Sequence, residues 1–167
     1  MQENININNK IIGPGAPTFV IAEISGNHGG EIKNAIKLID EAKSIGADAV
    51  KLQTYTADTI TLNSEKEDFI IPAGNAWEDS KTLYSLYTDA YTPWEWHERL
   101  FNHAKKIDIE IFSSPFDNTA VDFLESLNVP MYKIASPEIF DVQLLKKVAS
   151  TGKPVILSTG LARLDDI

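Results

Sequence analysis

The sequence predicts an α/β protein built as the front part of a (β/α)8 TIM barrel. Apolar, β-branched runs alternate with helical patterns along the 167 residues, which is typical of parallel strands joined by helical crossovers. Polar side chains stand at the carboxyl ends of five successive predicted strands, where a barrel gathers them at one mouth. Because a whole barrel takes roughly 250 residues, we expect about five βα units, with 1–167 as the N-terminal portion of the barrel domain.

The individual elements follow from apolar spacing and from residues that start or stop helices. Strands are predicted at 18–24, 48–55, 109–115, 131–136 and 154–160, and helices at 31–46, 92–107, 118–127 and 141–150. Each strand is an apolar run, and each helix repeats apolar residues every three or four positions. Gly46 suits the end of the first helix, because glycine readily adopts a left-handed conformation. Thr92 suits the cap of the second helix, and Pro93 its first position.

The connection over residues 56–91 is far longer than the roughly 2–6 residues usual for such a loop. It contains one short predicted helix, at 80–90. Long loops at the functional end of a barrel often cover the ligand, so we interpret this segment as a substrate lid or specificity loop. In the alternative interpretation, Phe69, Trp77 and Tyr87 form a small satellite core.

Composition excludes several classes of function. The net charge of -9 and pI of about 4.7 argue against a general affinity for nucleic acid or anionic membranes. An anionic ligand therefore needs a local cluster of positive groups. The absence of cysteine excludes disulfides, thiolate catalysis and cysteine-based zinc sites. The N-terminus lacks a signal-peptide pattern, and no apolar run approaches the roughly 20 residues of a membrane helix, so we expect a cytoplasmic protein.

Two strand lysines give the strongest indication of a ligand. Lys51 and Gln53 are two residues apart on a strand and should face the same way. Lys133 lies between apolar neighbours in the fourth strand. A lysine in an apolar strand needs a counter-charge, so the pair predicts a phosphate or carboxylate ligand, with serine hydroxyls as further donors. In the alternative interpretation, each lysine pairs with Glu23 or Glu138 and does not contact a substrate. Glu23 is then either solvated or paired with a neighbouring lysine.

The three histidines give no metal site. His28 follows a strand end and is interpreted as a hydrogen-bonding group beside the site, with a ligand or base role as the alternative. His97 and His103 lie in a predicted helix and are expected to be packing or surface residues. No two of them have the spacing of metal ligands.

Five motifs in register give the sequence a family resemblance. FVIAEISGNHGG, AVKLQTY, IFSSPFD, YKIASPE and GKPVILSTG resemble the sialic acid synthase family, and the likeness extends from about Lys10 to Ile167. Within the family, SGNHGG, TLNSEKEDFII and AYTPWEWH are most similar to the members that make pseudaminic acid. The members that make legionaminic acid are the nearest competitor, and an N-acetylneuraminate synthase is a further alternative.

The resemblance implies a set of site residues and partners. It implies Glu23 and Glu138 as catalytic residues, and Lys51, Gln53, Ser114, Lys133, Ser136 and Ser158 as substrate-binding residues. Ser114 stands where many relatives have threonine, which keeps the hydroxyl. The family also has a small C-terminal antifreeze-like domain that reaches into the partner of a homodimer, and two metal-binding histidines. The C-terminal domain and the two histidines are all expected beyond Ile167, so no metal ligand is expected in this chain.

The implied reaction is a carbon–carbon bond-forming transfer. Phosphoenolpyruvate condenses with the open-chain aldehyde of 2,4-diacetamido-2,4,6-trideoxy-L-altrose and releases phosphate, with Mn²⁺ or Mg²⁺ as Lewis acid. We expect the 167 residues alone to be inactive and to expose a barrel seam. Two other functions stay open: an aldolase that forms a Schiff base on Lys133 or Lys51, and a non-catalytic phosphosugar-binding fragment.

Overall fold

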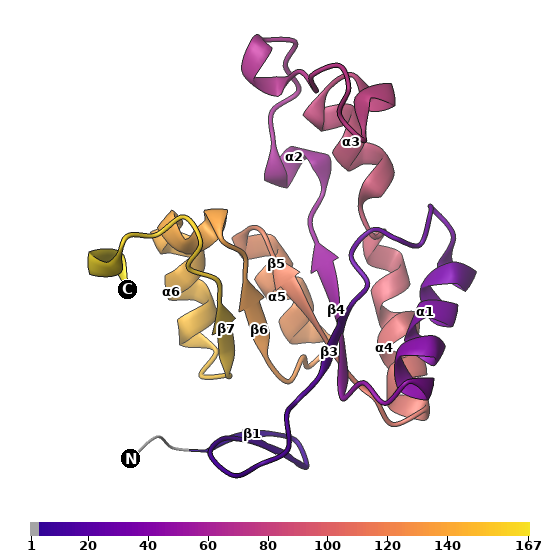
Figure 1. The fold of residues 1–167 in the computed structure, drawn as a ribbon, viewed down its shortest axis with the longest axis vertical. Helices are drawn as coiled ribbons and strands as arrows, with labels where there is room; N and C mark the ends of the chain where they lie inside the picture. Colours follow the sequence, from indigo (N-terminus) through magenta and orange to yellow (C-terminus); the bar gives the residue numbers. More distant parts are fainter. Residues whose placement is uncertain (1–3) are drawn as a thin grey trace.

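A five-stranded parallel sheet, curled into a half barrel, forms the centre of the protein (Figure 1). The computed structural model describes residues 4–167. The strands are β3 (Ile21–Glu23), β4 (Ala49–Thr54), β5 (Glu110–Pro115), β6 (Tyr132–Ile134) and β7 (Val155–Leu157). They pair in chain order and all in parallel, as successive barrel strands do. The predicted fold class is therefore confirmed, although β3, β6 and β7 are shorter than predicted.

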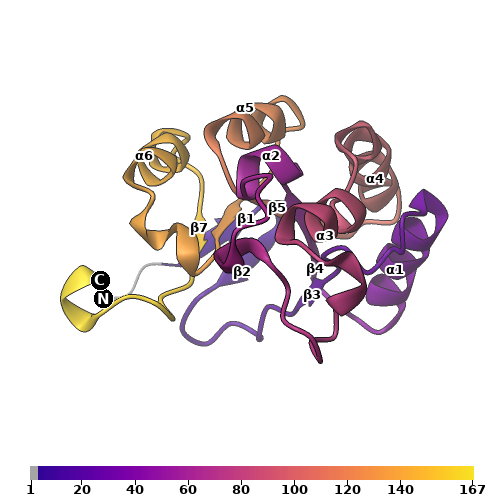
Figure 2. The same cartoon turned by 90° about the horizontal axis from the view of Figure 1, so that it is seen from above.

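Four helices cover the convex face of this sheet (Figure 2). They are α1 (Ile32–Ser44), α4 (Trp94–Lys106), α5 (Asn118–Ser126) and α6 (Val142–Ser150). All four were predicted, and Gly46 ends the first with a φ of +86°. The predicted cap of α4 is wrong, because Pro93 occupies the cap position without a side-chain bond. The Thr92 hydroxyl instead hydrogen-bonds with His28.

Alternation along the strands separates two faces of the sheet. Val50 and Leu52 of β4 are buried on the convex face, in one cluster with Leu100 of α4. Ala49, Lys51 and Gln53 therefore point to the concave face, since alternate residues of a strand face opposite ways. The concave face is apolar near the amino ends of the strands and polar near their carboxyl ends.

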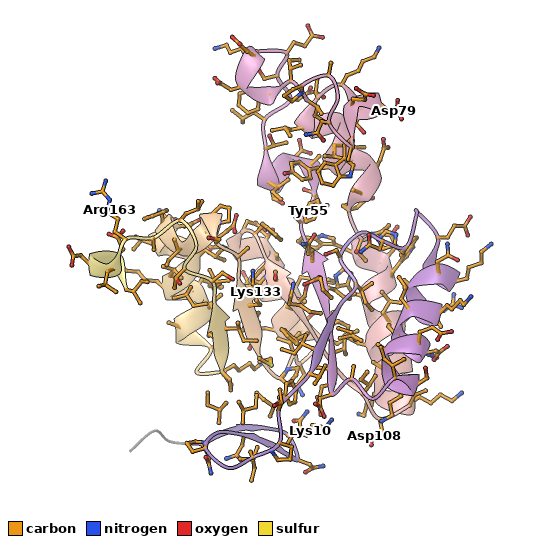
Figure 3. All side chains as sticks on the ribbon, in the orientation of Figure 1. Lys10, Tyr55, Asp79, Asp108, Lys133 and Arg163 are labelled. Atoms are coloured by element: carbon orange, nitrogen blue, oxygen red, sulfur yellow. The ribbon has the colours of Figure 1, made fainter. Side chains whose placement is uncertain are left out.

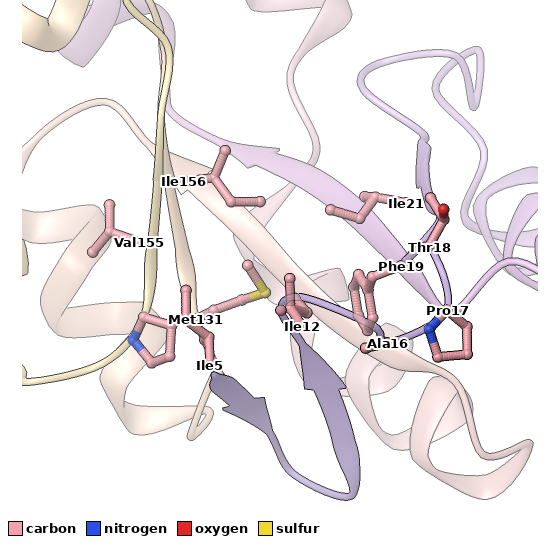
Figure 4. A pocket seen from close by; sticks show the side chains of 12 residues that line it. Ile5, Ile12, Ala16, Pro17, Thr18, Phe19, Ile21, Met131, Val155 and Ile156 are labelled. Atoms are coloured by element: carbon pink, nitrogen blue, oxygen red, sulfur yellow. The ribbon is translucent and has the colours of Figure 1, made fainter. Parts of the chain in front are cut away.

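A hairpin that the sequence analysis missed closes the amino end of the half barrel. Its strands are β1 (Ile5–Ile7) and β2 (Lys10–Ile12), which pair antiparallel. Ile7 is buried against Phe112 and Met131 on the concave face. Lys10 Nζ lies 2.7 Å from Asp48 Oδ1, which ties the hairpin to the start of β4. Figure 4 shows Ile12 and Met131 beside an apolar hollow of about 470 Å³ between hairpin and sheet.

The long connection stands above the carboxyl end of β4 as a separate excursion (Figure 1). It contains α2 (Ala57–Ile60), two 3₁₀ turns (Glu67–Phe69 and Glu78–Ser80) and α3 (Leu83–Ala90), the helix predicted at 80–90. Tyr87 packs edge-on against Tyr55, with ring centroids 5.6 Å apart. Trp77 is 59% exposed, so the alternative of a satellite core that includes Trp77 is wrong. Within residues 4–167, none of the helices has the length and apolar character needed to span a membrane.

Candidate functional site

The carboxyl ends of the strands bring the predicted polar residues together on the concave face. Parallel pairing aligns Glu23 with Lys51, and Gln53 with Ser114. Figure 3 shows Lys133 in the middle of the sheet, below Tyr55 at the base of the excursion. Four neighbouring strands therefore contribute two lysines, an amide, a hydroxyl and a carboxylate to one surface.

Lys51 forms an ion pair with Glu23 across the β3–β4 pair. Its Nζ atom contacts Glu23 Oε2 and lies 3.4 Å from Ser114 Oγ. The Lys51 side chain is only 12% exposed, whereas that of Glu23 is 42% exposed. One alternative from the sequence, an internal pair between a lysine and a glutamate, is therefore present for Lys51. The cation is nearly buried, and the carboxylate opens to solvent at the mouth.

Lys133 has no such carboxylate. Among the residues that the structure describes, none places a carboxylate within 4.0 Å of its Nζ atom. Burial lowers the pKa of Lys133, and the neighbouring charge of Lys51 lowers it further. The charges of Glu23 and Glu138 act in the opposite direction and raise it. In a chain of net charge -9, two ammonium groups thus lie on one face, and only that of Lys51 has a carboxylate at ion-pair distance among the described residues. An anionic ligand can bind to such a pair.

Glu138 supplies a second carboxyl group, which is more buried than that of Glu23. It lies in the 3₁₀ turn Pro137–Phe140 that follows β6. Burial raises the pKa of Glu138, and its Oε2 atom is buried without a hydrogen-bond partner among residues 4–167. The backbone hydrogen bond and the charge of Lys133 act in the opposite direction and lower this pKa.

The serines divide between the two faces. Ser136 Oγ accepts a hydrogen bond from the Leu161 amide at 3.0 Å and keeps its own proton for donation. Ser158 follows β7 and is half-buried, on the side of the strand that carries Ile156. Ser113, the neighbour of Ser114 in β5, faces the other way. It is buried on the convex face, where its hydroxyl lies 2.7 Å from Thr54 Oγ1.

His97 joins this buried chain of hydroxyls beneath α4. Its Nδ1–H donates to the Pro93 carbonyl at 3.2 Å, so Nε2 accepts from Thr54 Oγ1 at 2.9 Å. Burial lowers the pKa of His97 to about 4. His97 is thus a packing residue, and His103 lies at the surface with Nε2 2.7 Å from Asp40, as predicted for this pair. This series of hydrogen bonds, from His97 through Thr54 to Ser113, fixes the end of β4 beside Gln53.

His97 should make the protein less stable in mild acid. Its folded pKa of about 4 is depressed below the unfolded value of about 6.5, so only the unfolded chain gains a proton between these values. Stability present above pH 6.5 is therefore lost as pH falls to 4, by about 3 kcal/mol for this residue. Urea unfolding of wild type and His97→Gln at several pH values measures this loss. An equally steep acid loss in the variant would contradict the assignment.

One turn, residues 24–30, connects the end of β3 with the excursion. His28 Nδ1 accepts from the Gly30 amide at 3.2 Å, so Nε2–H donates to Thr92 Oγ1, also at 3.2 Å. The His28 ring packs edge-on against Trp96 at 5.2 Å. His28 is thus a buried hydrogen-bonding group, as interpreted from the sequence. Through these contacts the turn after Glu23 holds Thr92 and Trp96, where the chain returns from the excursion to α4.

Gly26 should be the position of this turn least tolerant of a side chain. A methyl group there would lie 2.2 Å from the backbone oxygen of Ala90, at the end of α3. We expect Gly26→Ala to lower the melting temperature and to speed hydrogen exchange in residues 83–91. The matched control is Gly29→Ala, where φ is +57° but no atom lies within 4 Å; strain alone costs it about 1 kcal/mol. An equal or smaller loss for Gly26→Ala would contradict the close contact.

The described residues do not hold a metal site. No group of three histidine, aspartate or glutamate side chains among residues 4–167 lies close enough to bind an ion. At the mouth, Glu23 is engaged by Lys51, and Glu138 is a single carboxyl in a buried setting. The donor set present here suits an anion rather than a divalent cation.

Known proteins resemble the chain in both sequence and fold. The NeuB family matches residues 38–167, which is more than half of the chain. Pseudaminic acid synthase from Helicobacter pylori is 52% identical over 146 residues, which is 87% of this chain and 42% of that protein. N,N'-diacetyllegionaminic acid synthase from Legionella pneumophila is 39% identical over 168 residues, or 100% of this chain and 47% of that protein.

A solved structure agrees with these relatives. N-acetylneuraminic acid synthetase from Leptospira borgpetersenii, crystallised with citrate, superposes with a TM-score of 0.81 at 33% identity, covering 99% of this chain and 52% of that one. The chain spans less than half the length of the curated relatives it matches. The family match over residues 38–167, the sequence identity to these relatives and the shared fold together show that the chain belongs to the NeuB family.

Proposed function

We propose that this chain carries the phosphoenolpyruvate-binding half of a pseudaminic acid synthase. The observation that carries the proposal is the pair Lys51 and Lys133, two ammonium groups close enough to affect each other's charge, of which only Lys51 forms an ion pair among the described residues. Phosphoenolpyruvate has a phosphate and a carboxylate, so it presents two anionic groups to two cations. The choice of pseudaminic acid rests on relatives of that name, at 52% and 48% identity, against 39% and 38% for the legionaminic enzymes.

The remaining donors fit the same ligand. Gln53 and Ser114 lie beside Lys51 at neighbouring strand ends. Ser136 and Ser158 follow the next two strands and offer hydroxyl protons. Hydrogen bonds from neutral donors add to ion pairs in fixing an anion, because they set its orientation as well as its charge. Substrate binding is therefore assigned to Lys51, Gln53, Ser114, Lys133, Ser136 and Ser158.

The proposed reaction balances with groups that this chain supplies. C3 of phosphoenolpyruvate attacks the aldehyde carbon of the open-chain sugar, and the aldehyde oxygen takes up a proton. Water adds at C2 and loses a proton, and the C2–O bond breaks to release phosphate. The proposal gives Glu138, whose pKa is raised by burial, the role of a proton donor. It gives Glu23, exposed at the mouth, the role of orienting the sugar or the water.

Three further parts of the proposal concern the complete protein. A divalent metal, Mn²⁺ or Mg²⁺, would polarise the aldehyde oxygen, but residues 4–167 bring no ligand set together, and no step is assigned to it here. The excursion over 56–91 would act as the lid that selects the sugar. The proposed setting is a homodimer formed through the second domain, as the family resemblance implies, with the cytoplasmic location expected from the sequence.

The test is turnover by the full-length protein. We expect release of phosphate from phosphoenolpyruvate with 2,4-diacetamido-2,4,6-trideoxy-L-altrose, and slower release with the acceptor sugars of legionaminic and N-acetylneuraminic acid synthesis. A faster reaction with either of the other sugars would reassign the product. Borohydride treatment in the presence of pyruvate should leave Lys51 and Lys133 unmodified, and a reduced lysine adduct would favour the aldolase. Binding of phosphoenolpyruvate without turnover on any sugar would favour the non-catalytic alternative.

A further inference from the structure

Ser25, the residue two positions after Glu23, has an unusual backbone conformation. Its φ is +49°, in the left-handed region that side chains other than glycine rarely adopt. Short polar residues tolerate this region when the side chain finds a local hydrogen bond. Glycine would occupy the position without strain, so the serine side chain needs a reason to be there.

The partner of this side chain is Glu23. Ser25 Oγ lies 2.9 Å from Glu23 Oε1, and the Ser25 backbone N–H donates to the same oxygen at 3.0 Å. The other carboxylate oxygen, Oε2, pairs with Lys51. The two oxygens of one carboxylate are thus held by different elements, one by the turn after β3 and the other by β4.

We propose that Ser25 is a positioning residue for Glu23, whose hydroxyl holds the carboxylate at the mouth independently of Lys51. This inference rests on the proposed function, because it gives Glu23 a role in turnover and Lys51 a role in binding an anion. An anionic substrate beside Lys51 competes with Glu23 for the same ammonium group. A carboxylate held by Lys51 alone would be released at that moment, whereas the two Ser25 donors keep it in place for the acceptor.

Substitution of Ser25 in the full-length enzyme tests the inference. We expect Ser25→Ala to lower kcat about tenfold, as removal of a hydrogen bond to a charged group does, with little change in KM for phosphoenolpyruvate. Ser25→Gly relieves the backbone and also lacks the hydroxyl, so it should lose as much kcat as Ser25→Ala. Normal kcat in Ser25→Gly would overturn the proposal, because the hydroxyl would then be dispensable.

A double-mutant cycle separates positioning from a structural role. In a Glu23→Gln background, Ser25→Ala should cause almost no further loss of kcat, since the group that it positions no longer acts. A further loss equal to that in the wild-type background would overturn the inference. Ser126→Ala is the matched control: its hydroxyl also donates to an oxygen at the surface, the Phe123 carbonyl at 2.6 Å, and the variant should keep full kcat.

A crystal structure of full-length Ser25→Ala tests, without reference to activity, whether Ser25 holds the Glu23 carboxylate. We expect the Glu23 carboxylate to shift or to change rotamer, because only the backbone N–H of residue 25 then remains to hold Oε1. An unmoved carboxylate would overturn the inference even in an active enzyme. Absence of turnover by the wild-type protein with every sugar would instead defeat the proposed function, and the crystal structure would still decide whether Ser25 holds Glu23.

Discussion

Glu23→Gln should lower the turnover of the full-length enzyme by about 10²–10⁴-fold, the usual contribution of a group that moves or directs a proton. The carboxylate is 42% exposed at the mouth and is held from both sides, so it is oriented toward a substrate above the sheet. Glutamine has nearly the same shape and can still accept from Ser25, but it carries no charge and takes up no proton. Steady-state phosphate release measures the loss.

Binding of phosphoenolpyruvate should change much less in the same variant. Removal of the negative charge leaves Lys51 free to meet the ligand, so affinity should be equal or higher by calorimetric titration. Glu31→Gln is a matched control, because Glu31 forms a similar pair with Lys33 at 3.4 Å on the exposed start of α1. Turnover of Glu23→Gln near that of Glu31→Gln would remove Glu23 from the catalytic residues.

The fold class could be predicted because a barrel repeats strand and helix regularly, and this repeat is visible in the sequence. Apolar runs and amphipathic helices alternate at regular intervals, and each predicted helix lies within a few residues of its observed bounds. The hairpin of β1 and β2 was missed because its strands are three residues each. So short a run carries no clear period, and its stability comes from burial of Ile7 against the barrel. Only the tertiary structure supplies that contact.

Helix capping shows the same limit. Thr92 has the residue type of a cap, yet its hydroxyl bonds with His28, 64 residues away. Local preference predicted a local partner, and the turn of residues 24–30 provided a distant one. Asp141, by contrast, caps α6 through the Gln143 and Leu144 amides, where no distant group competes.

The sequence could place the candidate residues at one end of the sheet, but it could not show which of them pair. Alternation along β4 placed Lys51 and Gln53 on one face, and the structure confirms it. The same rule applied to adjacent serines would have separated Ser113 from Ser114. Ser25 was missed because its role depends on a positive φ, which a sequence without glycine at that position does not reveal. The Lys51–Glu23 pair required the register of β3 on β4.

The two lysines should respond differently to loss of their charge. Lys51→Met removes the ion pair with Glu23 and leaves that carboxylate only its Ser25 donors, so it should lower affinity and, to a small extent, the melting temperature. Lys133 is half-buried and lacks an ion pair within the described part of the chain. Removal of its desolvated charge should leave the melting temperature unchanged or raise it.

Lys133→Met should nevertheless weaken binding of phosphoenolpyruvate by about 2–5 kcal/mol, or roughly 30- to 4000-fold in Kd, because loss of one member of a buried charge pair leaves the other unpaired. Methionine keeps the length of the side chain and removes only the charge. Titration of full-length Lys51→Met and Lys133→Met measures the loss, with Lys147→Met as control, since Lys147 pairs with Asp122 at 2.6 Å on the outer surface. A stable Lys133→Met protein with unchanged affinity would show that its ammonium group does not meet the substrate. Weaker binding together with an unchanged melting temperature is expected only if the Lys133 ammonium group binds the ligand. If the group stabilised the fold instead, its removal would lower the melting temperature.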